Sequence, residues 1–404
     1  MRISVSHAGK QHSYHLAKAL LQLGKLERFY TSSYVTPAWL QRRLAGHAFF
    51  SRRFQPGLAA PYVSAHWGYE LREFAIRALQ GRGAAWTEAV YARDVTFDKD
   101  QARRIAADGS DTFWGFQGSA LHTLHACRRA GKRTLVELAT AHVLAARKYL
   151  GEEARLQPDW ADSFDNLVFP PDYEQRLREE PFAADYTVAA SGFTRQTLLD
   201  AGLPAERILY LPLGFDVDHV PYLPRTAPRQ GPLRLLYAGN VTQRKGMAYL
   251  LDAMESLPAS EVELHVVGTV QGSGRAFKAR RHLYRYQPAV SQLELFGLYA
   301  DYDALVLPTL FEGFGLVLVE AMAAGLPVIT TERSIGPELV DEDNNGYLVP
   351  LRDAAELRAA IERLASKDND SYQAMRLAAR QKALSFTWDA YGQRLAALLD
   401  TLQG

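Results

Sequence analysis

The chain has 404 residues, of which 48% are hydrophobic and 23% charged, and its formal net charge is +1. That length exceeds what one hydrophobic core usually supports, so we expect two domains, and the composition excludes a disordered chain. The single cysteine, Cys127, excludes an internal disulfide. No apolar run is long enough to span a bilayer, and residues 1–6 predict a first strand in place of a signal peptide. We therefore expect a cytoplasmic, globular protein.

The charge is unevenly distributed along the chain. Residues 1–150 carry 22 Lys and Arg against 10 Asp and Glu, whereas acidic residues are in excess after position 150. A basic first part indicates an anionic partner, such as a lipid phosphate, an anionic membrane or an acidic glycan. We find no nucleic-acid-binding motif and expect no nucleic acid partner. The acidic block 152–180 is expected to form a solvated surface.

A short loop follows the first expected strand, residues 2–6, and precedes a helix expected over 14–23. Open α/β sheets bind ligands beyond the carboxyl ends of their strands. Gly9 would allow close approach of the backbone and Lys10 would supply a positive charge. We therefore expect Gly9 and Lys10 to form a ligand-binding loop, which the family resemblance described below implies is an acceptor or phosphate loop. Three nearby histidines lack metal-ligand spacing and are expected in turns or facing solvent: His7, His12 and His15.

Residues 36–54 mix bulky apolar residues with arginines. Thr36 and Pro37 predict a helix start. Trp39 and several phenylalanines alternate with the arginines that follow them. Two interpretations stay open for this segment. It is either a peripheral contact with the anionic inner face of a membrane, or a flap that packs its aromatic residues on the domain.

Further elements are expected along the first domain and the linker after it. Strands are predicted over 110–117, 134–138, 184–190 and 208–211, and helices over 69–79, 121–129 and 197–201, with Ser191 as an N-cap or turn residue. Four prolines, at 221, 224, 228 and 232, indicate an extended linker. We place the first domain at 1–217, the second domain at 218–385 and a terminal helix at 386–404; the resemblance described below implies that the first is the acceptor-side domain and the second the donor domain.

The second domain is expected to open with a buried strand over 233–238. Arg244 and Lys245 follow it, and a helix is predicted from Met247. Two adjacent cations beyond the carboxyl end of a strand suit a diphosphate, because arginine donates to two oxygens and lysine supplies a compact charge. Further strands are predicted over 262–267, 304–307 and 327–330, amphipathic helices over 354–365 and 388–399, and a solvated helix face over 277–286.

Residues 311–325 form a glycine-broken turn followed by a helix. The helix is expected to start near Gly315 and to end at Gly325. Its first amide groups lack internal partners, so a helix start at this place favours an anion. Gly313 and Gly315 would let the backbone approach a ligand closely. Glu312 and Glu320 are spaced to accept hydrogen bonds from the hydroxyls of two rings on either side of a phosphate, as in a nucleotide sugar.

Residues 307–350 resemble the donor-binding signature of the retaining glycosyltransferases of family 4. The shared features are the spacing of Glu312 and Glu320, the segment 320–329 (Glu-Ala-Met-Ala-Ala-Gly-Leu-Pro-Val-Ile), and residues 345–350 (Asn-Gly-Tyr-Leu-Val-Pro). The resemblance implies an α/β fold of the GT-B type. In it two Rossmann-like doubly wound domains face each other across a cleft, and the C-terminal helix crosses back to the N-terminal domain.

The resemblance also implies roles for individual residues. Glu312 and His142 would act in catalysis, with His142 facing the donor sugar from the loop 137–142. Glu320 would bind the ribose. The donor diphosphate would be bound by Arg244, Lys245, Gly313, Phe314, Gly315 and Leu316. Two motifs depart from the family pattern. The first loop has one glycine where members often have more, and the motif at residues 334–338 lacks the two adjacent glycines that members more often have there.

The resemblance implies a metal-independent hexosyltransferase that acts with retention and needs no cofactor. The donor is expected to be a UDP-sugar, and the acceptor a glycan or a lipid-linked glycan in cell-surface polysaccharide or glycolipid synthesis. Two other classes stay open. One is a nucleotide-sugar epimerase or a phosphorylase-like GT-B enzyme, and the other is a non-catalytic nucleotide-sugar-binding subunit.

Overall fold

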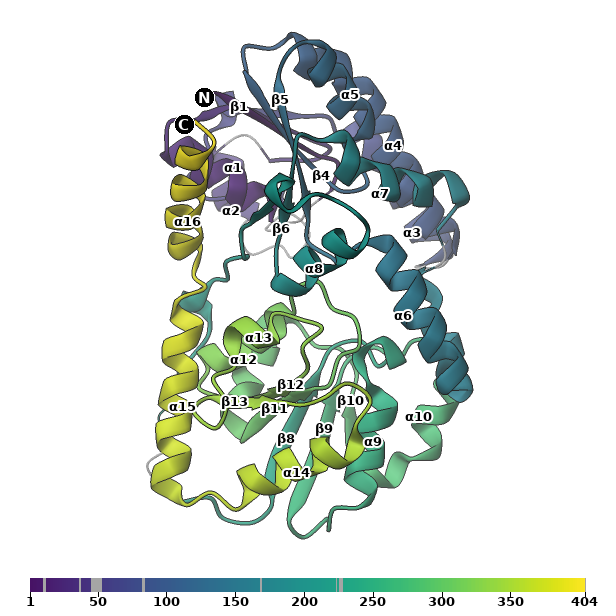
Figure 1. Ribbon diagram of the computed structural model, residues 1–404, viewed down its shortest axis with the longest axis vertical. Helices are drawn as coiled ribbons and strands as arrows, with labels where there is room; N and C mark the ends of the chain where they lie inside the picture. The colour runs from purple at the N-terminus through teal and green to yellow at the C-terminus, as the bar shows by residue number, and fades with distance from the viewer. Residues whose placement is uncertain are drawn as a thin grey trace.

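Two parallel sheets, each accompanied by helices, form the two domains of the computed structural model (Figure 1). The structure describes residues 1–9, 12–35, 38–44, 53–81, 84–167, 169–222, 224 and 228–403. Both sheets have the strand order of a doubly wound fold, in which the direction of winding reverses once. The expected architecture is therefore confirmed.

The first sheet has the order β3-β2-β1-β4-β5-β6-β7, so its winding reverses between β1 and β4. Its strands are β1 (Ile3–His7), β2 (Leu26–Thr31), β3 (Val63–Ala65), β4 (Thr112–Phe116), β5 (Arg133–Leu138), β6 (Tyr186–Ala189) and β7 (Ile208–Tyr210). All five residues of β1 and of β4 are buried. Burial on both faces is typical of parallel strands, and β4 is accordingly a nearly continuous apolar run, whereas β1 alternates apolar residues with buried serines.

Eight α-helices surround the first sheet in the described part of the chain. They are α1 (Ser13–Gln22), α2 (Ala38–Leu44), α3 (Leu71–Gln80), α4 (Ala84–Ala107), α5 (Leu121–Arg129), α6 (Val143–Leu156), α7 (Pro171–Ala183) and α8 (Gly192–Asp200). The last of these begins five residues before the helix predicted from Thr197. The predicted N-cap at Ser191 is confirmed, because its hydroxyl accepts a hydrogen bond from the amide of Thr194 at 3.0 Å, and it gives the helix this earlier start.

The second sheet has the order β10-β9-β8-β11-β12-β13, with its reversal between β8 and β11. Its strands are β8 (Leu233–Ala238), β9 (Val262–Val267), β10 (Arg285–Gln287), β11 (Ala304–Leu307), β12 (Val328–Thr330) and β13 (Gly346–Leu348). The helices are α9 (Met247–Glu255), α10 (Arg275–Ala279), α11 (Gln292–Leu298), α12 (Leu316–Ala323), α13 (Gly336–Leu339), α14 (Ala354–Ala365), α15 (Asn369–Leu384) and α16 (Trp388–Thr401).

The prediction of one solvated helix face over 277–286 is wrong. The segment contains the end of α10, a 3-10 turn (Arg281–Leu283) and the start of edge strand β10. Phe277 is buried, and Tyr284 stacks on it with ring centroids 4.1 Å apart. This aromatic pair folds the chain back on itself and ends the helix.

The last helix, α16, returns to the first domain (Figure 1). Tyr391, Leu395 and Leu399 lie four residues apart, so they share one helix face. That face is buried in the first-domain core together with Ile3 and Tyr14. The preceding helix, α15, packs on α12 of the second domain. The predicted crossing of the terminal helix is confirmed.

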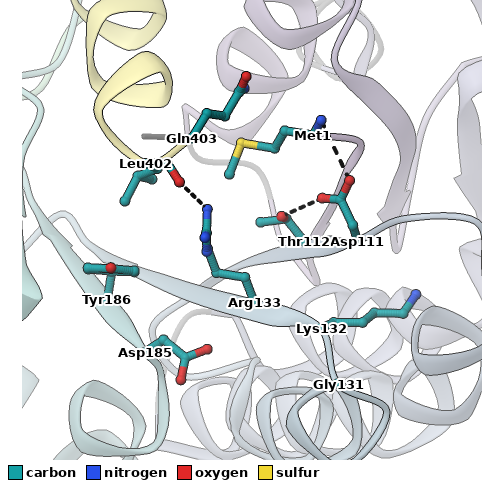
Figure 2. Close-up of a pocket in the computed structure, with 10 residues that line it drawn as sticks. All are labelled: Met1, Asp111, Thr112, Gly131, Lys132, Arg133, Asp185, Tyr186, Leu402 and Gln403. Atoms are coloured by element: carbon teal, nitrogen blue, oxygen red, sulfur yellow. Dashed lines mark hydrogen bonds and ion pairs between the residues drawn. The ribbon is translucent and has the colours of Figure 1, made fainter.

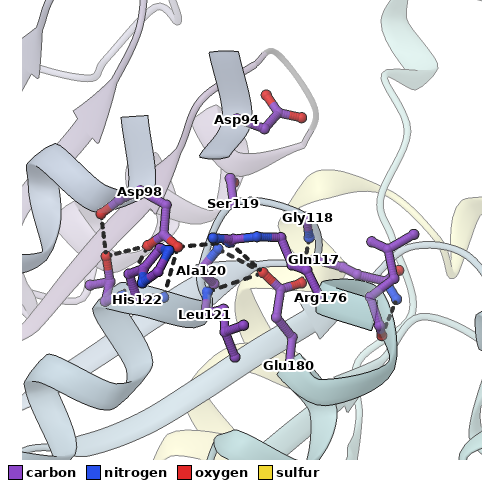
Figure 3. A network of polar contacts seen from close by, with 12 residues as sticks. Asp94, Asp98, Gln117, Gly118, Ser119, Ala120, Leu121, His122, Arg176 and Glu180 are labelled. Atoms are coloured by element: carbon purple, nitrogen blue, oxygen red, sulfur yellow. Dashed lines mark hydrogen bonds and ion pairs between the residues drawn. The ribbon is translucent and has the colours of Figure 1, made fainter. Parts of the chain in front are cut away.

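The prediction that the acidic block 152–180 is a solvated face is wrong for several of its members. Glu153, Glu174 and Glu180 are buried. Glu180 accepts hydrogen bonds from the amides of Gly118 and Ala120, ahead of α5, and from Arg176 at 3.2 Å (Figure 3). Burial raises the pKa of Glu180 to about 7. These amides and the guanidinium compensate for the loss of water around the carboxylate.

Candidate functional site

The candidate site lies where the winding of the second sheet reverses. Strands β8 and β11 are neighbours at that point, and each leads into a loop beyond its carboxyl end. The loop after β8 contains the cation turn, which we define as residues 242–246, and the loop after β11 contains the glycine turn, residues 311–315. Crevices at such reversal points are the usual ligand sites of open α/β sheets.

The cation turn is held in one conformation by its own residues. Thr242 caps it by accepting a hydrogen bond from the amide of Arg244 at 3.3 Å. Gly246 has a φ of 74°, and a Cβ added there would lie 1.9 Å from the carbonyl oxygen of Pro308. Only glycine fits this position, because the turn packs directly against the end of β11. The turn therefore presents Arg244 and Lys245 at a fixed distance from the glycine turn.

Glu312 lies between the two cations. Its Oε2 is 3.1 Å from Lys245 Nζ and 3.4 Å from a terminal nitrogen of Arg244. The same Arg244 nitrogen donates to the carbonyl of Phe311 at 3.0 Å. Burial favours the neutral acid, but Lys245 and Arg244 outweigh it and hold the pKa of Glu312 below its ordinary value. Glu312 is therefore ionised and serves as the counter-ion of both cations.

Helix α12 points its amino end at the same place. Gly315 is its N-cap, with a φ of 92°, and no side chain caps the helix. The first amide groups of an uncapped helix are free to bind an anion, and the helix dipole favours negative charge there. The loop before the helix is held by hydrogen bonds of Glu312 and Phe314 to residues 333 and 335. The predicted helix start at Gly315 and end at Gly325 are confirmed, since Gly325 has a φ of 82°.

The structure gives Gly313 a contact that differs from the expected approach to a ligand. A Cβ at this position would lie 2.1 Å from the carbonyl oxygen of Ala139 in the first domain. The Gly313 carbonyl accepts hydrogen bonds from the hydroxyls of Ser191 at 2.5 Å and Thr194 at 3.2 Å. Gly313 thus lets the first domain approach the glycine turn. Its assignment to the donor diphosphate stays a prediction.

The other predicted residues of the turn differ in exposure. Phe314 is buried in the second-domain core beside Phe386, so only its backbone is available to a ligand. Leu316, the first residue of α12, is 39% exposed. Glu320 is buried in the same helix and accepts a hydrogen bond from Gln292 Nε2 at 2.8 Å. Burial raises the pKa of Glu320.

His142 is placed in the first domain and is fully buried. It is the N-cap of α6, where its Nδ1 accepts from the amide of Leu144 at 3.4 Å, and its ring centroid lies 6.4 Å from that of Phe182. Burial lowers the pKa of His142 to about 4, so the ring is neutral at physiological pH. These contacts all lie within the first domain, and the catalytic role of His142 stays a prediction.

The expectation that the first three histidines lie in turns or face solvent is wrong for His7, which is buried in β1, whereas His12 does lie in a turn. His7 is buried with its Nδ1 3.2 Å from Ser119 Oγ, His12 is bonded to Glu137, and His15 stacks on Trp388 with centroids 3.7 Å apart. The sequence did not indicate these contacts because the partners are more than 100 positions away. A glutamate inside a buried strand, as Glu137 is in β5, was the available signal that a polar partner exists.

The first loop brings a residue that was not predicted. A Cβ added to Gly9 would lie 3.2 Å from a terminal nitrogen of Arg93, which reaches over from α4. Arg93 also pairs with Glu73 at 2.5 Å and Asp94 at 2.7 Å. Gly9 is therefore closely covered by a side chain. Lys10 lies outside the described residues, so the acceptor or phosphate loop stays a prediction.

Segment 36–54 is described only in part, since residues 36–37 and 45–52 lie outside the described ranges. Trp39 in α2 is 60% exposed. Phe54, by contrast, packs on the first-domain core, and Arg53 pairs with Glu70 at 3.0 Å. One end of the segment therefore behaves as a flap on the domain. Contact with a membrane stays a prediction. No helix among the described residues combines the length and apolarity needed to cross a bilayer.

A cavity of about 630 Å³ lies away from these loops (Figure 2). Thr112, Arg133 and Tyr186 line it, and they are the first residues of β4, β5 and β6. The cavity is thus at the amino edge of the first sheet, opposite to the edge at which ligands bind. Arg133 donates to the carbonyl of Leu402 there, which fastens the end of the terminal helix.

Among the described residues, no group of three or more His, Cys, Asp and Glu could hold a metal ion.

Comparison with known proteins locates a family within the chain. Residues 232–367 match the family model of glycosyl transferases group 1. The putative colanic acid biosynthesis glycosyltransferase WcaL of Salmonella typhimurium is 28% identical over 250 residues, covering 58% of this chain and 60% of that protein. The amylovoran biosynthesis glycosyltransferase AmsK of Erwinia amylovora is 30% identical, covering 51% and 53%. The chain thus spans about half to three-fifths of the length of these relatives.

Solved structures share the fold over nearly the whole chain. Anabaena Alr3699/HepE in complex with UDP and glucose aligns with a TM-score of 0.62 at 16% identity, covering 99% of this chain and 100% of that one. The lipopolysaccharide outer core galactosyltransferase WaaB aligns with the same TM-score and identity, covering 99% of both chains. The two-domain GT-B architecture is therefore shared in full.

Proposed function

We propose that this chain, which has the GT-B fold and carries a glycosyl transferases group 1 domain in its second half, is a hexosyltransferase. It would move a sugar from a nucleoside diphosphate donor to a hydroxyl of a glycan or lipid-linked acceptor, in polysaccharide or glycolipid synthesis. One observation carries the proposal: Lys245 and Arg244 share Glu312 as a counter-ion beside the uncapped amino end of α12. Fixed positive groups at a winding reversal suit a diphosphate.

The charges account for the chemistry of the transfer. Cleavage of the bond between a sugar and a diphosphate places negative charge on the leaving oxygen. Arg244, Lys245 and the first amides of α12 would stabilise that charge where it develops. Since they are fixed before the reaction, they need no reorganisation during it. We expect these cations to make a metal unnecessary, and the acceptor to attack with retention of configuration.

Glu312 has two uses in this scheme. With the site empty of donor it neutralises both cations, which keeps the buried charges paired. A bound diphosphate would take over as counter-ion, and the carboxylate would then accept hydrogen bonds from the hydroxyls of the sugar. Glu320, the fifth residue of α12, would accept hydrogen bonds from the hydroxyls of the ribose.

The comparisons support the choice of donor and of product. HepE has been solved with UDP and with UDP-glucose, which supports a UDP-sugar. WcaL and AmsK are glycosyltransferases of colanic acid and amylovoran biosynthesis, which supports a surface polysaccharide as product. The positive charge of residues 1–150 suits an anionic acceptor.

Two measurements test the proposal. Thermal shift with UDP, GDP and ADP identifies the base, and mass spectrometry of reactions with the matching nucleotide sugars detects transfer or donor hydrolysis. We expect stabilisation by UDP and its loss in Lys245→Ala. Lys382→Ala is the control, because Lys382 pairs with Asp341 on the surface. A wild-type protein that neither binds nor consumes any nucleotide sugar would refute the proposal.

A further inference from the structure

Helix α6 carries a buried carboxylate, Glu153. Among the described residues, all the hydrogen-bond donors to this carboxylate belong to the second domain. Glu153 is fully buried, and its oxygens accept hydrogen bonds from Gln243 Nε2 at 2.7 Å, the Tyr249 hydroxyl at 2.9 Å and Arg352 Nε at 2.7 Å. A buried charge is tolerated only where such donors surround it. All three partners lie beyond residue 240, although α6 belongs to the first domain in chain order. Figure 1 shows α6 running from one domain to the other.

One of these partners belongs to the cation turn itself. Gln243 precedes Arg244 and Lys245 and is fully buried. The side-chain Nε2 of Gln243 donates to Glu153, and the side-chain Oε1 of Gln243 accepts from the backbone amide of Ala248 in α9 at 2.8 Å. The Gln243 side chain therefore joins α6 to the first turn of α9.

The 3-10 segment after α6, Pro158–Leu167, holds the other side of the turn. The Ser163 hydroxyl accepts from the amide of Gln243 at 3.0 Å, and the Ser163 carbonyl accepts from the Thr242 hydroxyl at 2.8 Å. Ser163 and Thr242 are both buried. Glu153 thus holds the side chain of Gln243, and Ser163 holds the backbone amide of Gln243 and the hydroxyl of Thr242.

We propose that Glu153 and Ser163 are positioning residues for donor binding. They set the cation turn, and through it the places of Arg244 and Lys245. The part that concerns the donor rests on the function proposed above. The end of α6 and the 3-10 segment 158–167 thus contribute to the donor-binding unit, although they belong to the first domain in chain order.

Glu152 provides a matched comparison within the same helix. It also pairs with Arg352, at 3.1 Å, but its side chain is 44% exposed and none of its described bonds reaches Gln243. An exposed pair of this kind contributes little to structure. Glu152→Ala and Glu153→Ala therefore remove adjacent carboxylates from the same arginine, and only the second frees the cation turn.

Hydrogen–deuterium exchange of the full chain tests the positioning role without a ligand. We expect Glu153→Ala to raise the exchange rate of peptides covering 242–248 by about tenfold, and Glu152→Ala to leave it unchanged. Val188→Ala, a cavity in the first-domain core, controls for general destabilisation, because Val188 is buried in β6 far along the chain from the turn. Ser163→Ala repeats the test if Glu153→Ala does not fold.

Calorimetric titration with UDP then tests the consequence for the donor. We expect the dissociation constant to rise about tenfold in Glu153→Ala and to match the wild type in Glu152→Ala. Folded Glu153→Ala and Ser163→Ala proteins with unchanged exchange at 242–248 would overturn the positioning role. A wild type that does not bind UDP would instead contradict the proposed donor, while the exchange rates still decide whether the turn is held by α6.

Discussion

The ammonium of Lys245 lies 3.1 Å from the carboxylate of Glu312, and the guanidinium of Arg244 approaches the same oxygen at 3.4 Å. The cations follow β8 and the acid follows β11, so the sheet reversal brings them together across 67 positions of chain for Lys245 and 68 for Arg244. A phosphate that enters this place competes with Glu312 for both cations. Affinity for the diphosphate and turnover of the sugar should therefore respond differently to changes at Glu312.

Replacing Glu312 by glutamine should separate these two effects. The variant loses the competing charge, so we expect it to bind UDP at least as tightly as the wild type. It also loses the carboxylate that would fix the sugar, so we expect kcat to fall by about 100-fold or more. Calorimetry with UDP and a steady-state transfer assay measure the two quantities. Wild-type turnover in the variant would exclude a catalytic role.

Gly246 should tolerate no side chain. Its φ is 74°, and an added Cβ would meet the Pro308 carbonyl at 1.9 Å. Gly131 has a φ of 75° with nothing within 4 Å, so Gly131→Ala measures the cost of the left-handed backbone alone, about 1 kcal/mol. We expect Gly246→Ala to lose clearly more stability in urea denaturation, and also UDP binding. Equal losses in the two variants would contradict the packing of the cation turn on β11.

Gly313→Ala should disturb the contact between the two domains. The new Cβ would lie 2.1 Å from the Ala139 carbonyl in the first domain. We expect a loss of kcat, because the two domains can no longer approach as closely. Titration with UDP separates the two roles of Gly313: affinity within about twofold of wild type would limit it to the domain contact, and a clear loss would support its predicted assignment to the diphosphate. Gly392→Ala in α16 is the control, as its Cβ meets nothing within 4 Å. Full activity in Gly313→Ala would show that turnover tolerates a wider separation of Gly313 from Ala139.

His142 should make the protein sensitive to acid. Burial lowers its pKa to about 4 from 6.5, so the unfolded chain binds a proton at pH values where the folded chain does not. The contribution of His142 to the free energy of unfolding is fully present above about pH 6.5. It falls by on the order of 3 kcal/mol as the pH decreases toward about 4. Urea denaturation at a series of pH values should show a shallower decline in His142→Gln. His219→Gln, which replaces an exposed histidine, is the control. An equal decline of stability with pH in the wild type and in His142→Gln would contradict this role of His142.

The sequence predicts nine of the thirteen described strands and misses β2, β3, β10 and β13. Strands β8, β9 and β11 have their predicted bounds, and the four buried residues of β11 form the continuous apolar run expected of a strand covered on both faces. Edge strands β3 and β10 have three residues each and are only partly buried, so no such run marks them. In place of β10 the arginines of 280–285 suggested a helix surface.

The site was predictable where it depends on local order along the chain. A strand, a turn and a helix start determine which edge of the sheet carries Arg244, Lys245 and Glu312, and the structure brings these three together. Contacts between distant segments leave no local pattern. For this reason the first-domain contact of Gly313 and the bonding of Glu153 to Gln243 emerge only from the fold.

A crystal structure with a bound UDP-hexose tests the central claim most directly. We expect the diphosphate within hydrogen-bonding distance of Arg244, Lys245 and the amides of residues 315 and 316, with Glu312 turned from the cations toward the sugar. A diphosphate bound elsewhere, for example beside Lys132 and Arg133 in the cavity at the opposite edge of the first sheet, would contradict the account.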